Sequence, residues 1–193
     1  MQATRLLVQS TTYRLGLLGE QVVGRILDHL SSDSVRVYHD LEVREPGRKP
    51  WNIDHVVVTP AGVFAIETKT RRKPRESSSN GQKGHQVVFD GSQMVFPEPM
   101  KPDRYGLEQA GRNASWLAGK LAELNGEPIS VIPVLVFPGW WVEAKSKGPV
   151  AVMNAKQLPG FLSGRAPLLS PNRFRAISAQ LEERSRIDLS APQ

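Results

Sequence analysis

The sequence predicts an α/β fold in which helices flank a mixed central sheet, with an inserted hairpin and a C-terminal helix as additions. Three observations predict it: a helical apolar repeat over residues 15–30, two short β-branched runs at 53–59 and 62–69 on either side of a turn, and a second helical repeat at 104–125 that precedes a buried run. With one further strand between the first helix and the turn, the order αβββαβ is typical of helical layers packed on one sheet.

The first helix is expected over residues 15–30 and brings one acidic residue, Glu20, close to the core. Its main apolar stripe is Leu15, Leu18, Val22, Ile26 and Leu30, and a second stripe is Gly16, Glu20 and Gly24. Apolar residues on most sides predict a packed helix, in which a partly buried Glu20 needs a partner that the glycines let it approach. The alternative is that Glu20 lies in an exposed first turn, where it complements the helix dipole.

A strand is expected at 35–43, followed by a polar connector and then by a hairpin whose register places two carboxylates together. The connector Thr59-Pro60-Ala61-Gly62 has the proline and glycine that a type I turn prefers. If Thr59 and Gly62 flank the turn, Asp54 faces Glu67, with Cβ atoms roughly 4.5–5.5 Å apart. Lys69 shares the face of Glu67. Two carboxylates at that distance repel each other, so we expect a cation between them or a proton on one of them.

A basic loop is expected at residues 70–84, directly after Lys69, and a small hairpin around Asp90-Gly91 follows it at 85–96. The loop either contacts phosphates or is simply solvated. Its candidate nucleic-acid-binding residues are Arg71, Arg72, Lys73 and Arg75.

The second helix, at 104–125, has a core stripe and a polar side. The core stripe comprises Leu107, Ala110, Ala114, Leu117, Leu121 and Leu124. The polar side, which can bind phosphate or be ordinary surface, comprises Gln109, Arg112, Asn113, Trp116 and Lys120. Strands at 129–137 and 150–153, a short helix at 155–162 and a terminal helix at 172–187 follow. We expect a lead-in at 1–14, one domain at 15–164 and a helical appendage at 165–193.

Composition restricts the chemistry to oxygen ligands and an anionic partner. The absence of cysteine excludes disulfides, thiol catalysis and cysteine-based zinc sites, and the four histidines show no metal-binding spacing. Carboxylates, a backbone carbonyl and waters suit Mg²⁺. The net charge of +6 favours nucleic acid as the partner. With no membrane span and no signal peptide in the sequence, we expect a cytoplasmic protein without a membrane partner.

The order of elements, with Asp54 on one strand and Glu67-Thr68-Lys69 on the next, resembles the PD-(D/E)xK nuclease superfamily, which has a restriction-endonuclease-like core. More narrowly, four blocks at 16–20, 52–59, 62–69 and 109–113 resemble the nuclease-related domain family, NERD. The resemblance implies a catalytic set of Glu20, Asp54, Glu67, Lys69 and Gln109. Ile53 stands where the superfamily has a proline.

The activity that this resemblance implies is Mg²⁺-dependent hydrolysis of phosphodiester bonds, with Mn²⁺ as a substitute and with DNA favoured over RNA as the substrate. Asp54, Glu67 and the backbone carbonyl of Thr68 would hold the metal, and Glu20 would act through a water or a second ion. Arg112 and Asn113 join the basic loop as candidate nucleic-acid contacts. The alternatives are a non-cleaving nucleic-acid-binding module and a protein-interaction domain that uses Trp140-Trp141 and the terminal helix. The oligomeric state stays open.

Overall fold

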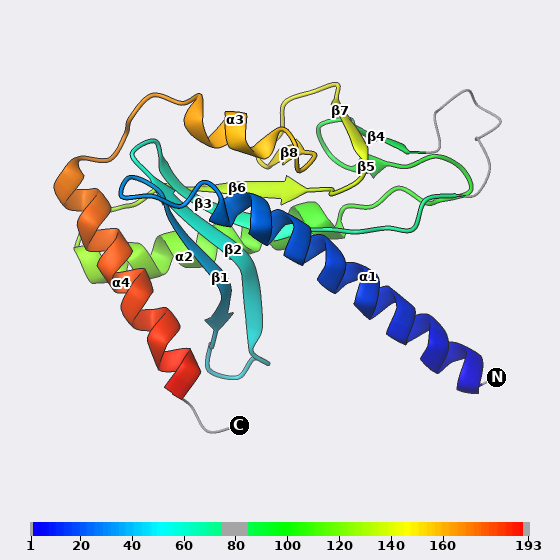
Figure 1. Ribbon diagram of the computed structural model, residues 1–193, viewed down its shortest axis with the longest axis horizontal. Coiled ribbons are helices and arrows are strands. Elements are labelled where there is room, and N and C mark those ends of the chain that lie inside the picture. Colours follow the sequence, from blue (N-terminus) through cyan, green and yellow to red (C-terminus); the bar gives the residue numbers. More distant parts are fainter. Residues whose placement is uncertain (1, 75–84, 191–193) are drawn as a thin grey trace.

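The computed structural model describes residues 2–74 and 85–190 and shows a mixed α/β fold with helices on both faces of a central sheet (Figure 1). The five-stranded sheet has the order β1-β2-β3-β6-β8. Its strands are β1 (Arg36–Val43), β2 (Trp51–Thr59), β3 (Gly62–Thr68), β6 (Val131–Val136) and β8 (Ala151–Met153). The helices are α1 (Gln2–Asp28), α2 (Tyr105–Asn125), α3 (Leu158–Ser163) and α4 (Pro171–Ser190).

The predicted hairpin register is confirmed. β2 and β3 pair antiparallel around the two-residue connector, with Thr59 opposite Gly62 and Val56 opposite Ala65. On its other side β3 pairs in parallel with β6, which follows α2 along the chain. Every residue of β3 is buried, as expected for a strand with a neighbour on each side and a helical layer on each face. The last residues of β3 therefore carry their side chains into a packed environment.

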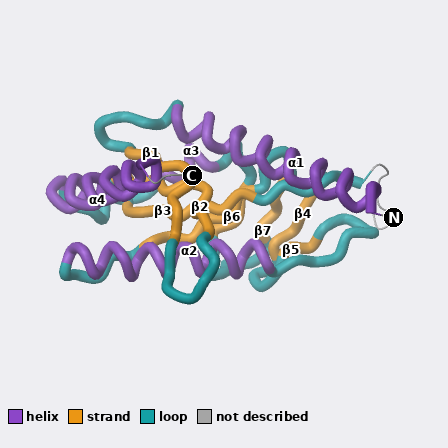
Figure 2. The backbone as a smooth tube through the Cα atoms, turned by 90° about the horizontal axis from the view of Figure 1, so that it is seen from below, coloured by secondary structure: helices purple, strands orange, loops and turns teal. Residues whose placement is uncertain are grey.

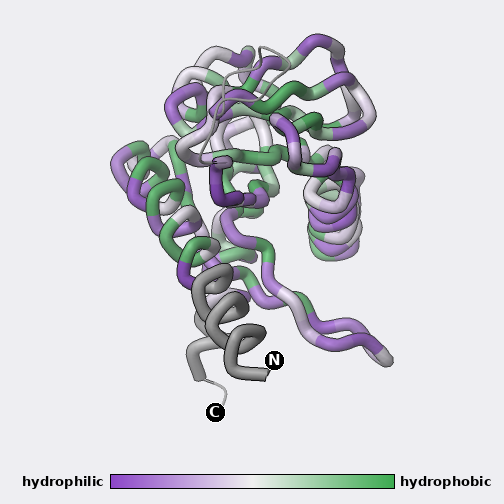
Figure 3. Tube along the Cα trace, turned by 90° about the vertical axis from the view of Figure 1, so that its right-hand side faces the viewer, coloured by the Kyte–Doolittle hydropathy of each residue, from purple (hydrophilic) through white to green (hydrophobic). Residues whose placement is uncertain are grey.

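Two hydrophobic layers hold the helices to the sheet. Val23 and Leu27 of α1 pack with α3 and with Phe64 on one face, while Leu117 of α2 and Ile177 of α4 pack on the other. Figure 2 shows α1 and α2 on opposite sides of the strands. Hydrophobic and hydrophilic residues alternate along the helices (Figure 3), as this one-sided packing requires.

The structure corrects the predicted orientation and length of the first helix. α1 begins at Gln2 rather than at residue 15, and Leu18 and Val22 of the predicted core stripe are 57% and 41% exposed. The buried side contains Gly19, Val23 and Leu27 instead. The reason is a close approach: a methyl group at Gly19 would overlap Thr70 Cγ2 and lie 3.1 Å from Pro138 Cγ. The glycine-bearing face is the one that can reach the end of β3.

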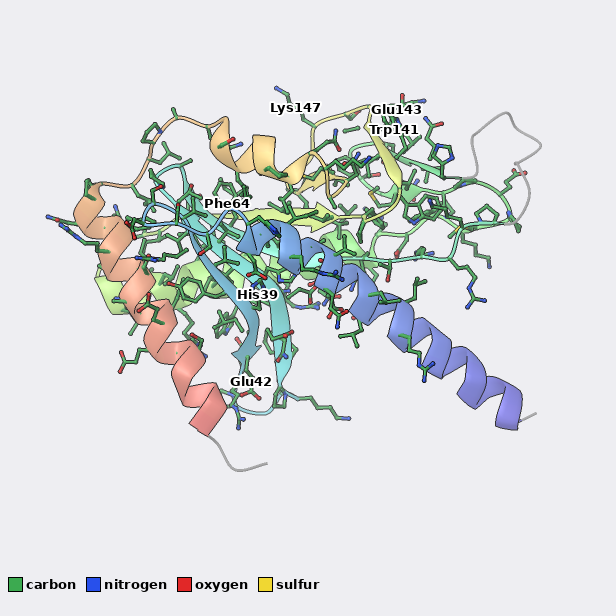
Figure 4. The ribbon with its side chains drawn as sticks, viewed as in Figure 1. His39, Glu42, Phe64, Trp141, Glu143 and Lys147 are labelled. Carbon is green, nitrogen blue, oxygen red and sulfur yellow. The ribbon has the colours of Figure 1, made fainter. Side chains whose placement is uncertain are left out.

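The predicted hairpin is present as β4 (Gln86–Phe89) and β5 (Met94–Val95), but it belongs to a second, three-stranded sheet that the sequence did not predict. Its third strand, β7 (Trp141–Ala144), pairs in parallel with β4. Trp140 is 4% exposed and packs edge-on against Phe96, whereas Trp141 is 62% exposed on the outer edge (Figure 4). The two tryptophans therefore do not form one exposed surface.

The terminal helix α4 shares the main core, although the sequence predicts it as an appendage. Ile177 and Leu181 are almost fully buried, and the hydroxyl of Tyr38 in β1 donates a 2.8 Å hydrogen bond to the carbonyl of Ser178. Pro167 before the helix and Pro171 at its start thus mark a turn in the chain and not the edge of the folded unit. In the described part of the chain, no helix combines the length and apolarity that crossing a lipid bilayer requires.

Replacing Gly19 by alanine should separate α1 from the end of β3. The new methyl group overlaps Thr70 and crowds Pro138, so we expect a loss of about 1–3 kcal/mol in the free energy of unfolding, measured by urea denaturation. Gly119→Ala in α2 is the matched control, because no described heavy atom outside its own helix segment lies within 4 Å of the added methyl group. That control should gain about 0.5–1 kcal/mol. Equal stabilities of the two variants would contradict the proposed close packing.

Candidate active site

The predicted carboxylates and lysine meet just beyond the last paired residues of the β2–β3 hairpin. The ladder ends at His55 and Ile66; beyond it, Asp54 Oδ2 accepts a 2.7 Å hydrogen bond from the amide of Thr68. Lys69 Nζ donates to Glu67 Oε1 at 2.7 Å. The side chain of Glu67 is 2% exposed, and that of Lys69 is 27% exposed. The lysine therefore forms the boundary between a buried carboxylate and solvent.

The electrostatics of this group favour a proton or a cation. Burial, and then the charge of Glu67, raise the pKa of Asp54, while the hydrogen bond from Thr68 opposes the increase. Burial also raises the pKa of Glu67, with Lys69 acting in the opposite direction. One ammonium group does not offset two buried carboxylates, so the site retains a demand for positive charge.

Asn113 of α2 holds the second oxygen of Glu67. Its Nδ2 donates a 3.0 Å hydrogen bond to Glu67 Oε2, and its Oδ1 accepts one of 3.0 Å from Trp51 Nε1. The indole N–H can only donate, so this contact fixes the orientation of the amide. Because Asn113 is 1% exposed, its side chain lies against the carboxylate and not at the surface where we expected a contact with nucleic acid.

Gln109 lies one helical turn before Asn113 on the same side of α2. Its Oε1 is buried and has no hydrogen-bond partner among the described residues. A buried amide oxygen without a partner is costly in a finished protein interior. It is therefore available for a donor that enters from outside the protein, such as a water molecule.

Glu20 approaches from the opposite face of the sheet on α1, and the alternative that it lies in an exposed first turn is wrong, because the helix begins at Gln2. Burial, and then Asp40, raise the pKa of Glu20, and Lys69 lowers it. This influence of Lys69 places Glu20 within electrostatic range of the site. The close packing at Gly19 is what brings α1 there.

A histidine pair beside Glu20 was missed in the sequence. His39 and His55 are opposed residues of β1 and β2, with their Nδ1 atoms 2.8 Å apart, and His39 Nε2 is 2.9 Å from Asp28 Oδ1. His39 lies where α1 crosses the strands (Figure 4). Burial, and then His39, lower the pKa of His55 to about 4. Pairing 35–43 with the hairpin in register would have revealed the contact.

The basic residues predicted to contact nucleic acid differ in their exposure and in their contacts within the protein. The guanidinium of Arg71 pairs with Asp103 and lies 4.6 Å from the centre of the Phe96 ring, whereas Arg72, Lys73 and Arg112 are exposed. Arg112 also lowers the pKa of Glu67, so it lies near the site. Arg75 lies outside the described residues.

Two further contacts were missed because they join distant segments. Trp51 of β2 positions Asn113, as described above. Tyr105, the first residue of α2, places its ring centre 5.7 Å from Lys69 Nζ. Trp51 directly precedes the block at residues 52–59 that resembles the family, and this position in the sequence could have marked it as a site residue.

The donor set suits a hard cation that needs few protein ligands. Within residues 2–74 and 85–190, no group of three or more histidine, aspartate or glutamate side chains is arranged to enclose a metal ion. Mg²⁺ is usually held by one or two carboxylates and retains several waters. The two buried carboxylates, with their unmet demand for positive charge, fit such an ion.

The family comparison agrees with this geometry. Neither a curated protein nor a solved structure matches the chain. The family described as "Nuclease-related domain" (NERD) matches residues 15–138, more than half of the chain, and this range contains Glu20, Asp54, Glu67, Lys69 and Gln109. The chain therefore belongs to the nuclease-related domain family.

Proposed function

We propose that this protein is a Mg²⁺-dependent nuclease that hydrolyses phosphodiester bonds, with DNA as its substrate. The observation that carries the proposal is the convergence of two buried carboxylates, Asp54 and Glu67, with the ammonium group of Lys69 at the end of one hairpin. Membership of a nuclease-related family supports it. A purely structural salt bridge would need neither the second carboxylate nor its burial, since unpaired buried charges cost several kcal/mol.

Asp54 and Glu67 would hold the metal, and Glu20 would act through a water molecule. The Thr68 carbonyl is the backbone ligand that the sequence suggests. When bound, the metal supplies a polarised phosphoryl oxygen and a water of lowered pKa. The raised pKa values of the carboxylates support this assignment, because a cation offsets both the loss of solvation on burial and the repulsion between neighbouring carboxylates.

The remaining roles, which are stabilising charge, positioning Glu67 and holding the water, would fall to Lys69, Asn113 and Gln109. An ammonium group has three N–H donors, and within the described residues Lys69 uses one, on Glu67. The others would stabilise charge that develops on the phosphate or orient the attacking water. Asn113 keeps Glu67 in one rotamer. The unpartnered oxygen of Gln109 offers an acceptor for that water.

The rival function is a nucleic-acid-binding module of the same fold that does not cut. The net charge of +6 and the exposed Arg72, Lys73 and Arg112 support binding under either proposal. Buried carboxylates facing a phosphate weaken a pure binder, which favours catalysis. Cleavage assays separate the two.

Removing either Asp54 or Lys69 should abolish cleavage. We expect the wild type to cut DNA with Mg²⁺ or Mn²⁺ and not with EDTA, and Asp54→Ala and Lys69→Ala to lower kcat by about 100-fold or more, the usual effect of losing one group that stabilises the transition state. Supercoiled, linear and single-stranded DNA are incubated in parallel with RNA, and products are resolved on gels.

Lys147→Ala is the matched control, because it removes one exposed lysine from the outer edge after β7 (Figure 4) and should leave the rate unchanged. Activity that survives both active-site substitutions would overturn the catalytic assignment. Retention of DNA without cutting under every condition would favour the binding module.

Mg²⁺ should stabilise the wild type through Asp54. At 100 times its Kd, a ligand adds about 2.7 kcal/mol, which for a chain of this size raises the melting temperature by about 5–10 °C. Asp54→Asn should lose most of this increase while melting no lower than the metal-free wild type, because it replaces a buried carboxyl whose ionised form burial disfavours. The effect of Mg²⁺ should grow from about pH 6 to about pH 8, since the carboxylates bind it when ionised.

Asp33→Asn serves as the control for this melting experiment, because Asp33 is a fully exposed carboxylate in another part of the molecule. Its response to Mg²⁺ should equal that of the wild type. An equal Mg²⁺ shift in the Asp54→Asn variant would show that the ion binds elsewhere.

Asn113 should act by positioning Glu67. Asn113→Ala is expected to lower kcat by about 10- to 100-fold with little change in KM, as for other residues that orient metal ligands. Trp51→Phe removes the N–H that holds the amide and should reduce kcat in the same direction by less. If Asn113 instead contacts nucleic acid directly, KM will rise, kcat will persist and Trp51→Phe will have no effect.

A further inference from the structure

Tyr105 presents an aromatic ring to solvent directly beside the candidate catalytic lysine. The residue is 60% exposed, and its ring centre lies 5.7 Å from Lys69 Nζ, which is itself 2.7 Å from Glu67 Oε1. A phosphate that Lys69 contacts would therefore bring its own nucleoside to the ring. None of the roles proposed above uses this side chain.

The backbone that carries the ring is held firmly. The amide of Tyr105 donates a 2.9 Å hydrogen bond to Asp103 Oδ1, and Asp103 pairs with Arg71 and exchanges backbone hydrogen bonds of 2.8 and 2.9 Å with Met94. At the next position, a methyl group on Gly106 would lie 3.2 Å from Lys69 Cγ. On this held backbone, a tyrosine has only two side-chain torsion angles to order when a ligand stacks on its ring.

The end of α2 that carries Tyr105 is basic. Arg104 directly precedes Tyr105 and Arg112 lies two turns further along the helix, and both are exposed. These two arginines complement the phosphates of a nucleic-acid strand.

These features favour a substrate with exposed base faces. In a duplex the faces of the bases are covered by their stacked neighbours, whereas unpaired bases stack readily on protein aromatic rings. We propose that Tyr105 stacks on an unpaired base next to the scissile phosphate, so that the substrate is single-stranded at this nucleotide. The inference rests on the proposed nuclease function and specifies its substrate class.

Binding measurements without hydrolysis test the stacking contact. In EDTA, we compare the affinity of the full chain for two fluorescent strands: an oligothymidine of about 12 nucleotides and a strand of equal length built only from abasic sugar phosphates. This length lies within the site size of known single-strand binders. Tyr105→Ala should weaken oligothymidine binding by about 5- to 150-fold. Tyr105→Phe should stay within about twofold of wild type because it retains the stacking ring. All variants should bind the abasic strand equally.

Leu124→Ala is the control, since Leu124 is 59% exposed on the same helix and about 28 Å away along its axis; it should bind as wild type. Equal losses in the alanine and phenylalanine variants would assign a contact between the tyrosine hydroxyl and phosphate and overturn the stacking. No loss in Tyr105→Ala, an equal loss on the abasic strand, or no binding of oligothymidine by wild type would also overturn it.

The same variants separate this inference from the proposed function. If the protein cuts nucleic acid but Tyr105→Ala binds and cuts as wild type, the stacking inference fails and the nuclease stands. If no preparation cuts but the predicted binding pattern is observed, hydrolysis fails and Tyr105 still contacts an unpaired base.

Discussion

The burial of the Glu67 carboxylate is the constraint on which the rest of the site depends. Glu67 belongs to β3, which is paired on both edges and covered on both faces, so bulk water cannot solvate the charge. A buried carboxylate costs several kcal/mol unless its oxygens are satisfied. Lys69 satisfies one oxygen and Asn113 the other. The burial of Glu67 thus explains why a lysine and an asparagine lie beside it.

The fold explains why this cost arises at one particular end of the sheet. β3 and β6 are parallel and joined through α2, and open α/β sheets bind ligands beyond the carboxyl ends of such strands. Lys69 and Thr70 lie directly after β3, and Pro138 lies after β6. Gly19 lets α1 reach the same place and bring Glu20. The close helix packing and the cluster of charges are therefore two aspects of one arrangement.

Local signals were sufficient for the hairpin and insufficient for the contacts between distant segments. The Thr59-Pro60-Ala61-Gly62 connector specified the register. Asp54 and Glu67 lie one residue beyond the last pair, close enough for the charge of Glu67 to raise the pKa of Asp54. The buried face of α1 was not predictable, because two apolar stripes compete on that helix and the choice depends on a close contact with Thr70. Trp51, His39 and Tyr105 were missed because each acts through a partner on another segment of the chain, and the sequence was not searched for these pairings.

Under the proposed function, the double engagement of Lys69 links the binding of substrate to the binding of a cation. In the structure its ammonium group compensates Glu67 and lies beside Tyr105. A phosphate placed against Tyr105 attracts the ammonium and weakens its pairing with Glu67, which leaves more buried negative charge to be balanced. A divalent cation supplies that balance, so substrate and cation should each strengthen the binding of the other, as thermodynamic linkage requires. Lys69 thus couples the binding of a cation by the carboxylates to the binding of the nucleotide.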